Sequence, residues 1–367
     1  MTDNVLQVSS KTDIKSLPRL HLGIRWLPLF LMLAVLIVVF FLVLLMGSVK
    51  IPLTDILAVL SGGEASKSSW TTIILQFRLP KATTAILAGS ALAVSGLMIQ
   101  TFFRNPLAGP FILGVSSGAS LGVALVILAV GTVGGAVIAG LGLMGDFALA
   151  AAAGLGAGVT MLIVLLIAHR VRNSMTLLIL GLMFGYFTSA VVSLLLYFSI
   201  PERIQVYIQW TFGTFGGTTW NQITIFAPLV IFGLITSFAM SKPLNALLLG
   251  ETYARSMGLN VQQAQIVIIA LTAILAGAVT AFCGPIAFIG IAVPHLSRSI
   301  LGTSDHRALI PASILMGAMV ALFASLIAEL PGSQIVLPLN AVTSLIGAPV
   351  VMWVILRRRN LNKTFAS

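Results

Sequence analysis

The sequence predicts an all-α membrane protein with about ten transmembrane helices and an inverted internal repeat. The chain of 367 residues is 58% hydrophobic and only 8% charged, whereas soluble domains carry roughly 25% charged residues. Long apolar stretches recur along the chain, and two segments match when the sequence is shifted against itself. These observations exclude a water-soluble globule, a disordered chain and a nucleic-acid-binding domain.

The first apolar stretch begins after a polar, basic tail. Residues 1–25 carry Lys11, Lys15, Arg19 and Arg25, and Leu27–Met46 follows. About 20 helical residues span the ~30 Å hydrocarbon core, and a cleavable signal would have a shorter apolar region. We therefore expect residues 1–25 to be a cytoplasmic N-terminal tail before the first transmembrane helix.

Nine further apolar stretches extend the membrane domain to residue 357 and leave a cytoplasmic tail at 358–367. They cover roughly residues 81–103, 111–133, 146–168, 175–199, 222–240, 264–283, 285–302, 308–328 and 339–356. Fourteen of the 20 Lys and Arg residues fall in the tails and alternate loops, and five fall on the opposite side. Basic loops stay in the cytoplasm, so we predict a multi-pass protein of the inner (cytoplasmic) membrane with both termini cytoplasmic.

The internal repeat is visible at an offset of 188 positions. Ala85–Gly89 matches Ala273–Gly277, Gly96 matches Gly284, and Gly114 matches Gly302. The two copies start five helices apart, so they would enter the membrane in opposite orientations. Inverted repeats with Gly/Pro-broken helices are typical of transporters.

The sequence offers no internal source of energy or chemistry. All nine acidic residues fall in loops or near predicted helix ends, whereas ion-driven transporters usually keep a carboxylate within the membrane. No nucleophile–base pair or metal-ligand cluster occurs, and Cys283 is the only cysteine. We predict no catalytic residue, metal site or cofactor, and a partner that supplies the energy. An autonomous secondary transporter is the rival interpretation, and an intramembrane enzyme is a weaker one.

Several longer motifs resemble the permease family of ABC importers for ferric siderophores, haem and vitamin B12. They are Arg78-Leu79-Pro80-Lys81, Arg104-Asn105-Pro106-Leu107-Ala108-Gly109-Pro110, Gly284-Pro285-Ile286-Ala287-Phe288-Ile289-Gly290, Val293-Pro294-His295, Ser304-Asp305-His306-Arg307 and Leu345-Ile346-Gly347-Ala348-Pro349. The resemblance covers about residues 25–358 and implies a type II ABC importer permease domain over residues 26–357. It also implies two ATPase subunits, a second permease subunit and a periplasmic or lipid-anchored binding protein, with membrane lipid around the chain and no nucleic acid partner. We expect a homodimer in preference to a heterodimer, although the family contains both.

The same resemblance assigns a cytoplasmic coupling loop to residues 241–262. It reads as a short helix that lies in a cleft of the ATPase, in which Ala254 allows close approach and Gly258 stops the helix. The coupling residues expected from the motif are Gly250, Glu251, Ala254, Arg255 and Gly258. The alternative is an ordinary solvated loop.

On the outer face, the resemblance implies that Arg78 and Lys81 contact acidic groups of the binding protein; the alternative is that both anchor a helix end. Here the chain departs from the family pattern at Ser325, Glu329 and Val336. In particular, a basic docking position has become Glu329, so the partner's complementary charges would be rearranged.

Two constrictions of the pathway are implied near the cytoplasm. One involves Asn105 and Leu107, and the other is the turn that contains Ser174 and Met175. A plain loop or a helix cap is the alternative for the second. The substrate implied by the family is a metal chelate, for which we favour a ferric siderophore or related iron complex, with vitamin B12 or haem as alternatives.

Overall fold

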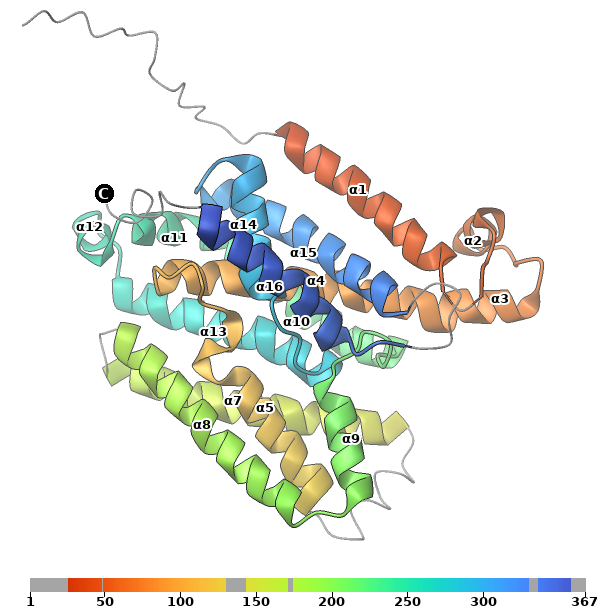
Figure 1. Ribbon diagram of the computed structural model, residues 1–367. Coiled ribbons are helices and arrows are strands. Elements are labelled where there is room, and N and C mark those ends of the chain that lie inside the picture. The colour runs from red at the N-terminus through yellow and green to blue at the C-terminus, as the bar shows by residue number, and fades with distance from the viewer. Residues whose placement is uncertain (1–25, 48, 130–142, 171–173, 330–335, 358–367) are drawn as a thin grey trace, which may run out of the picture.

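The computed structural model describes residues 26–47, 49–129, 143–170, 174–329 and 336–357, and all regular structure within these ranges is helical (Figure 1). Within the described residues, seven helical spans are long and apolar enough to cross a membrane: Trp26–Leu45, Ser68–Phe102, Phe147–Arg170, Met175–Tyr197, Trp220–Ala239, Val261–Cys283 and His306–Ala328. Three shorter apolar helices cover Val115–Leu128, Ile289–Leu301 and Leu339–Trp353. Each of the ten predicted apolar stretches therefore corresponds to one of these ten helices.

The helices carry the labels of Figure 1. The apolar ones are α1 (Trp26–Leu45), α4 (Leu79–Phe102), α5 (Val115–Ala124), α7 (Leu143–Arg170), α8 (Ser174–Tyr197), α10 (Trp220–Ala239), α13 (Val261–Cys283), α14 (Ile289–Leu301), α15 (His306–Ala328) and α16 (Leu339–Arg357). Shorter ones are α2 (Leu53–Leu60), α3 (Ser68–Thr72), α9 (Pro201–Thr211), α11 (Ser241–Leu248) and α12 (Glu251–Ser256). A π-helical stretch, Ile73–Arg78, joins α3 to α4.

Helix α4 forms the centre of the bundle and packs against α10, α13, α14 and α15. Its residues from Ala88 to Phe102 are all buried. Two glycine contacts bring the backbones together: Gly89 lies against Gly317 of α15, and Gly96 against Gly290 of α14, with no room for a Cβ at either site. Small residues at crossings of this kind are how membrane helices approach closely.

The predicted repeat register is right at one end and wrong at the other. Gly114 and Gly302 both adopt left-handed backbone, with φ of 81° and 62°. Gly284 ends α13 with φ 74°, whereas its partner Gly96 lies in the middle of α4. The two stretches share an order of elements, a long helix, a break, a shorter helix and another long helix, but one fixed offset does not superimpose their breaks.

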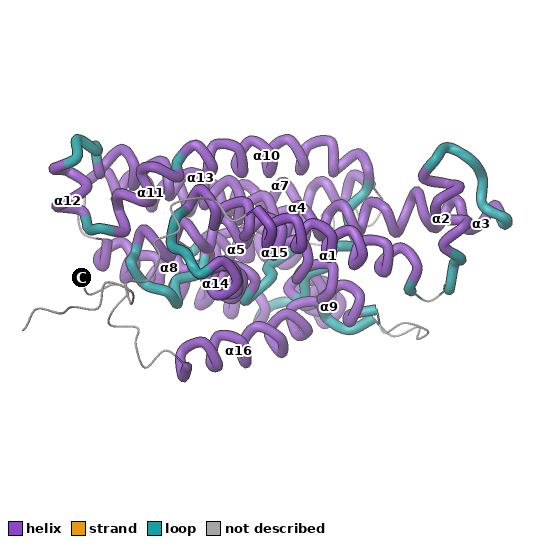
Figure 2. The backbone as a smooth tube through the Cα atoms, turned by 90° about the horizontal axis from the view of Figure 1, so that it is seen from above, coloured by secondary structure: helices purple, strands orange, loops and turns teal. Residues whose placement is uncertain are grey.

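The two ends of the bundle differ in the elements that they expose. Helices α11 and α12 lie at one end, where α1 begins and α16 ends, and α2 and α3 project at the opposite end (Figures 1 and 2). The span from Ser68 to Phe102 has 35 residues and is about 52 Å long at 1.5 Å per residue. It is therefore much longer than a ~30 Å hydrocarbon core. Its first part, α3, and the preceding helix α2 lie beyond that core.

Candidate functional site

Helix α12 is a defined helix that is stopped at both ends. Gly250 precedes it with φ 105°, and Glu251 in its first turn faces Arg255 at 3.6 Å, one turn later. At the other end Gly258 has φ 84°. Its N–H donates to Arg255 O (2.9 Å), and the N–H of Leu259 donates to Ala254 O (3.0 Å). This is the Schellman pattern that ends helices at glycine, so the predicted short helix and its glycine stop are present.

The faces of α12 are reversed relative to the expectation for Ala254. Ala254 has no exposed surface and packs inside the chain itself, so it cannot be the site at which a partner approaches closely. The exposed large apolar side chains of the segment are Leu249 (59%), Tyr253 (53%) and Met257 (52%). Tyr253 and Met257 are one helical turn apart and form an apolar stripe along the outer face of α12, whereas Leu249 lies before the break at Gly250.

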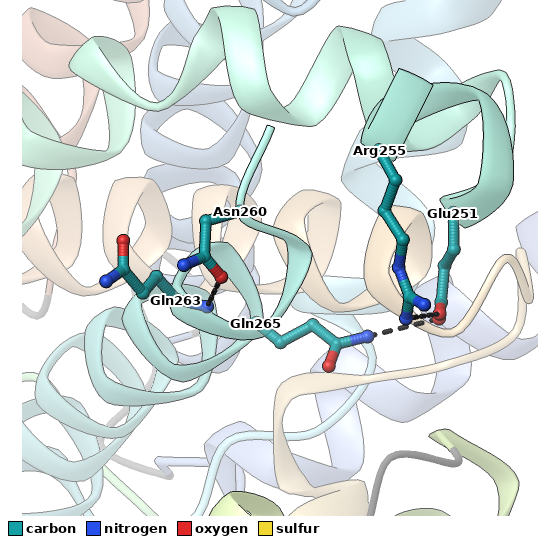
Figure 3. A network of polar contacts seen from close by, with 5 residues as sticks. All are labelled: Glu251, Arg255, Asn260, Gln263 and Gln265. Atoms are coloured by element: carbon teal, nitrogen blue, oxygen red, sulfur yellow. Dashed lines mark hydrogen bonds and ion pairs between the residues drawn. The ribbon is translucent and has the colours of Figure 1, made fainter. Parts of the chain in front are cut away.

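A polar link joins α12 to the start of α13 (Figure 3). Gln265 Nε2 donates to Glu251 Oε1 at 3.1 Å, and the Asn260 side chain caps α13 by accepting from Gln263 N, also at 3.1 Å. Beside the link lies a cavity of about 230 Å³, whose lining includes Arg255 and Gln265. Glu251 therefore ties α12 to the first turns of α13.

Arg78, predicted as a docking residue, is buried at the end of α1. Only 8% of Arg78 is exposed, and its guanidinium donates to the carbonyls of Leu44, Leu45 and Val49. The carbonyls of Leu44 and Leu45 are among those that the C-terminus of α1 leaves without partners, and a cation there is favoured by the helix dipole. Val49 lies just beyond the helix. This geometry agrees with the alternative for Arg78, the anchoring of a helix end.

Lys81 forms an ion pair with Glu329, the residue that departs from the family pattern. Their side chains are 13% and 35% exposed, and they join α4 to the residue that follows α15. The change to an acid at position 329 thus has a partner within the chain. It follows that neither charge is fully available to another protein while the pair is closed.

The first predicted constriction lies in the break after α4. Asn105 is half-buried, and its Oδ1 accepts from the N–H of Leu107 (2.9 Å), while Leu107 is 45% exposed. Arg104 holds this turn with φ 47°. His295 Nε2 lies 2.7 Å from Pro106 O and so fastens the break to α14.

The second predicted constriction is only partly described. Met175, near the start of α8, is 62% exposed. The Ser174 side chain and residue 173 lie outside the described part of the chain. Helix α8 packs closely on the 110–113 turn, because Gly181 leaves no room for a Cβ beside Ile112 O. The break after α4 and the helix α8 are thus neighbours.

The comparisons with known proteins identify the family. The family model described as the FecCD transport family matches residues 35–357. The chain belongs to the FecCD transport family. One curated relative, the vitamin B12 import system permease protein BtuC of Escherichia coli O9:H4 (strain HS), is 36% identical over 322 residues, which cover 86% of this chain and 95% of the relative. BtuC of Citrobacter koseri is 37% identical over 286 residues, 78% of this chain and 83% of the relative.

A solved structure agrees with this family. The inward-facing conformation of a metal-chelate type ABC transporter has a TM-score of 0.77 and 27% identity, and the match covers 90% of this chain and 98% of that chain. PsaBC from Streptococcus pneumoniae, at 16% identity and a TM-score of 0.50, shares the fold. As a FecCD permease, the chain is a multi-pass inner-membrane transport component and not a catalytic subunit.

The family motifs did not reveal the large apolar side chains that are exposed at and around α12. They concentrated attention on glycines and small residues, although Leu249, Tyr253 and Met257 carry a readable signal, large apolar side chains at four-residue spacing in a polar segment. They also missed the role of Asn245 in α11, since no local pattern shows that its side chain reaches a residue 61 positions away.

Proposed function

We propose that this chain is the translocation subunit of an ATP-driven importer that moves a metal chelate inward. Two ATPase subunits would bind at the α11–α12 end, a second permease subunit, which we take to be another copy of this chain, would complete the pathway, and a binding protein would deliver substrate at the α2–α3 end. Both termini would be cytoplasmic, on the side of α12.

The observation that carries this proposal is the construction of α12. The helix is stopped at Gly250 and Gly258, it is tied to α13 through Glu251, and it presents an apolar stripe that its own chain does not cover. Exposed apolar stripes on otherwise polar surfaces mark protein interaction sites, and a helix of this kind fits a groove on a partner. A solvated connecting loop would need none of these features.

The rival, a secondary transporter driven by ions, lacks support within the spans. Asp55 is the only buried acidic side chain among the described residues, and it lies in α2, outside the candidate spans. Ion-driven transporters usually keep a carboxylate inside the membrane. The energy source is therefore better assigned to a partner.

The substrate is proposed as a metal chelate, with two members of that class to be tested first. The curated relatives named above are vitamin B12 permeases, which supports cobalamin. A ferric siderophore remains our candidate from the motifs, and the related structure is named for metal chelates in general. Specificity would reside largely in the binding protein, so the two are separated by experiment and not by the side chains of this chain.

The test begins with the full chain purified from native membranes together with whatever ATPase it retains. The complex is reconstituted in lipid vesicles, and uptake is measured with candidate binding proteins loaded with cobalamin or a ferric siderophore. We expect an ATPase to co-purify and one loaded binding protein to drive ATP-dependent uptake. A chain that purifies alone and moves solute down an ion gradient would overturn the proposal.

A further inference from the structure

A cluster of side chains joins α11 to the cores of α15 and α4. Asn245 lies in α11, three residues before its end at Leu248. Its Nδ2 donates to Asp305 Oδ1 at 2.6 Å, and its Oδ1 accepts from His306 N at 2.9 Å and lies 2.8 Å from His306 Nδ1. One amide therefore serves three groups at the start of α15.

These contacts determine which way the His306 ring is protonated. Because the Asn245 nitrogen is committed to the Asp305 carboxylate, its oxygen faces His306 and can only accept, so Nδ1 of His306 must carry a proton. The other nitrogen, Nε2, lies 2.8 Å from Thr101 Oγ1, in the last turn of α4. His306 has no exposed surface. The ring is thus a buried bridge between α11 and α4.

Asn245 is not needed to start α15. The Asp305 side chain already caps the helix by accepting from Arg307 N at 2.9 Å, which is the ordinary way of satisfying the first turn. The contacts of Asn245 are additional to that cap, and their effect is to join a neighbouring element to it.

The junction leads from α12 to the predicted constriction. On one side of Asn245, only residues 246–250 separate it from α12. On the other side, Thr101 is followed within four residues by Asn105, whose N–H donates to Gln100 O at 3.1 Å. A displacement of α12 that moves α11 would therefore pull on His306, on Thr101 and on the break that holds Leu107.

We infer that Asn245 is a positioning residue that, through His306, passes the movement of α12 to α15 and to the end of α4. This inference rests on the proposed function and adds a second route beside the Glu251–Gln265 link, which reaches α13 alone. Spatial continuity by itself does not establish coupling, so the inference has to be tested by cutting the junction and rebuilding it.

The chain offers a pair of substitutions that does this. Asn245→Asp removes the donor to Asp305 and places two carboxylates against each other. Adding Asp305→Asn restores a donor toward residue 245 and keeps an acceptor for His306. It gives up the cap on Arg307 N, because one oxygen, Asp305 Oδ1, accepts from both Asn245 Nδ2 and Arg307 N. Gln262→Leu is the control, because it removes a different polar link at the same end, from Gln262 Nε2 to His169 O (3.0 Å).

The measurement is substrate taken up per ATP hydrolysed, in vesicles that contain the complete complex. We expect Asn245→Asp to keep the ATPase bound and hydrolysing while uptake per ATP falls about ten-fold, within the range of allosteric couplings. The double variant should recover most of the loss, and Gln262→Leu should resemble wild type. A wild-type complex without ATP-driven uptake would instead refute the proposed function.

Two results would overturn the inference while the proposed function stands. One is an unchanged ratio in Asn245→Asp. The other is a fall in ATP hydrolysis and uptake together, in proportion to a loss of folded protein, which the double variant does not repair.

Discussion

The two ends of this permease are held together in different ways. At the end that carries α2 and α3, which is the outer end in the proposed orientation, the guanidinium of Arg78 is buried and bonded to main-chain carbonyls at and just beyond the end of α1. At the α12 end, the links are between side chains: Asn245 with Asp305 and His306, and Glu251 with Gln265. Main-chain carbonyls cannot be repositioned without unwinding a helix, whereas side-chain pairs can rotate and exchange partners.

The difference indicates which end is built to move. Buried polar groups that lose their partners cost free energy, so the outer anchor resists rearrangement. The links at the α12 end lie between part-buried side chains, and elements that move in allostery come from less stable regions. The predictions below test this contrast.

The largest effect is expected at the outer anchor. Arg78→Ala would leave carbonyls of α1 without a donor and should lower the free energy of unfolding by about 3 kcal/mol, since each orphaned buried group costs roughly 1–3 kcal/mol. Thermal unfolding of the purified chain measures this. The docking role predicts a different result, namely weaker affinity for the binding protein with unchanged stability.

The second effect is expected at the exposed stripe of α12. Tyr253→Ala should weaken association with the ATPase about ten-fold, because buried tyrosines are frequent hot spots of interfaces, and should leave the isolated chain as stable as before. Binding is measured by titrating the reconstituted permease with ATPase. An affinity equal to that of wild type would mean that the stripe does not form the contact.

Ala254 and Gly258 separate internal packing from contact with the partner. Gly258→Glu enters open space and costs only the strain of its left-handed backbone, about 1 kcal/mol, so it should fold and uncouple transport from hydrolysis. Ala254→Glu forces a charge into the interior and should reduce the yield of folded protein. Equal folding of the two variants would contradict the observed burial of Ala254.

Most of the fold could be predicted from the sequence, because a membrane helix is recognised from the length and hydrophobicity of a single continuous stretch. Each apolar stretch of suitable length became a helix, and Gly258 marked the end of the short helix α12. The short helices α2, α3 and α9 were not predicted, since they lack the length that makes a span recognisable.

The site was less predictable, because its contacts join distant residues. The orientation of Ala254, the burial of Arg78 and the pairing of Lys81 with Glu329 depend on how helices pack against each other, which no local pattern records. The departure at Glu329 was noticed from the sequence, but only the structure supplies its partner.

A smaller effect is expected for the ion pair at the outer end. Lys81→Glu should destabilise the chain by about 1 kcal/mol, the upper range for partly exposed pairs, through repulsion from Glu329. The double variant Lys81→Glu/Glu329→Lys should recover the loss, and differential scanning calorimetry of wild type, the two single variants and the double variant provides the cycle. If the double variant is no better than the single one, the pair contributes nothing and the two charges are free to act in docking.

The smallest effect is expected in the projecting segment that contains α2. The N–H and hydroxyl of Ser66 both donate to Asp55 Oδ1 at 2.6 Å, and these hydrogen bonds lower the pKa of Asp55 below its ordinary value of 3.8. Because the folded pKa is the lower one, the stabilisation is complete above about pH 4 and is lost as the pH falls through the folded pKa.

Hydrogen exchange at residues 61–67 should therefore be slow near pH 6 and accelerate, relative to the intrinsic rate, only in strong acid. Asp55→Asn should remove this pH dependence while α4 and α12 exchange as before, and an unchanged profile in that variant would show that Ser66 does not hold the segment. Such a local effect, confined to α2 and its loop, would fit an outer end whose strong anchor is Arg78 and whose remaining contacts are minor.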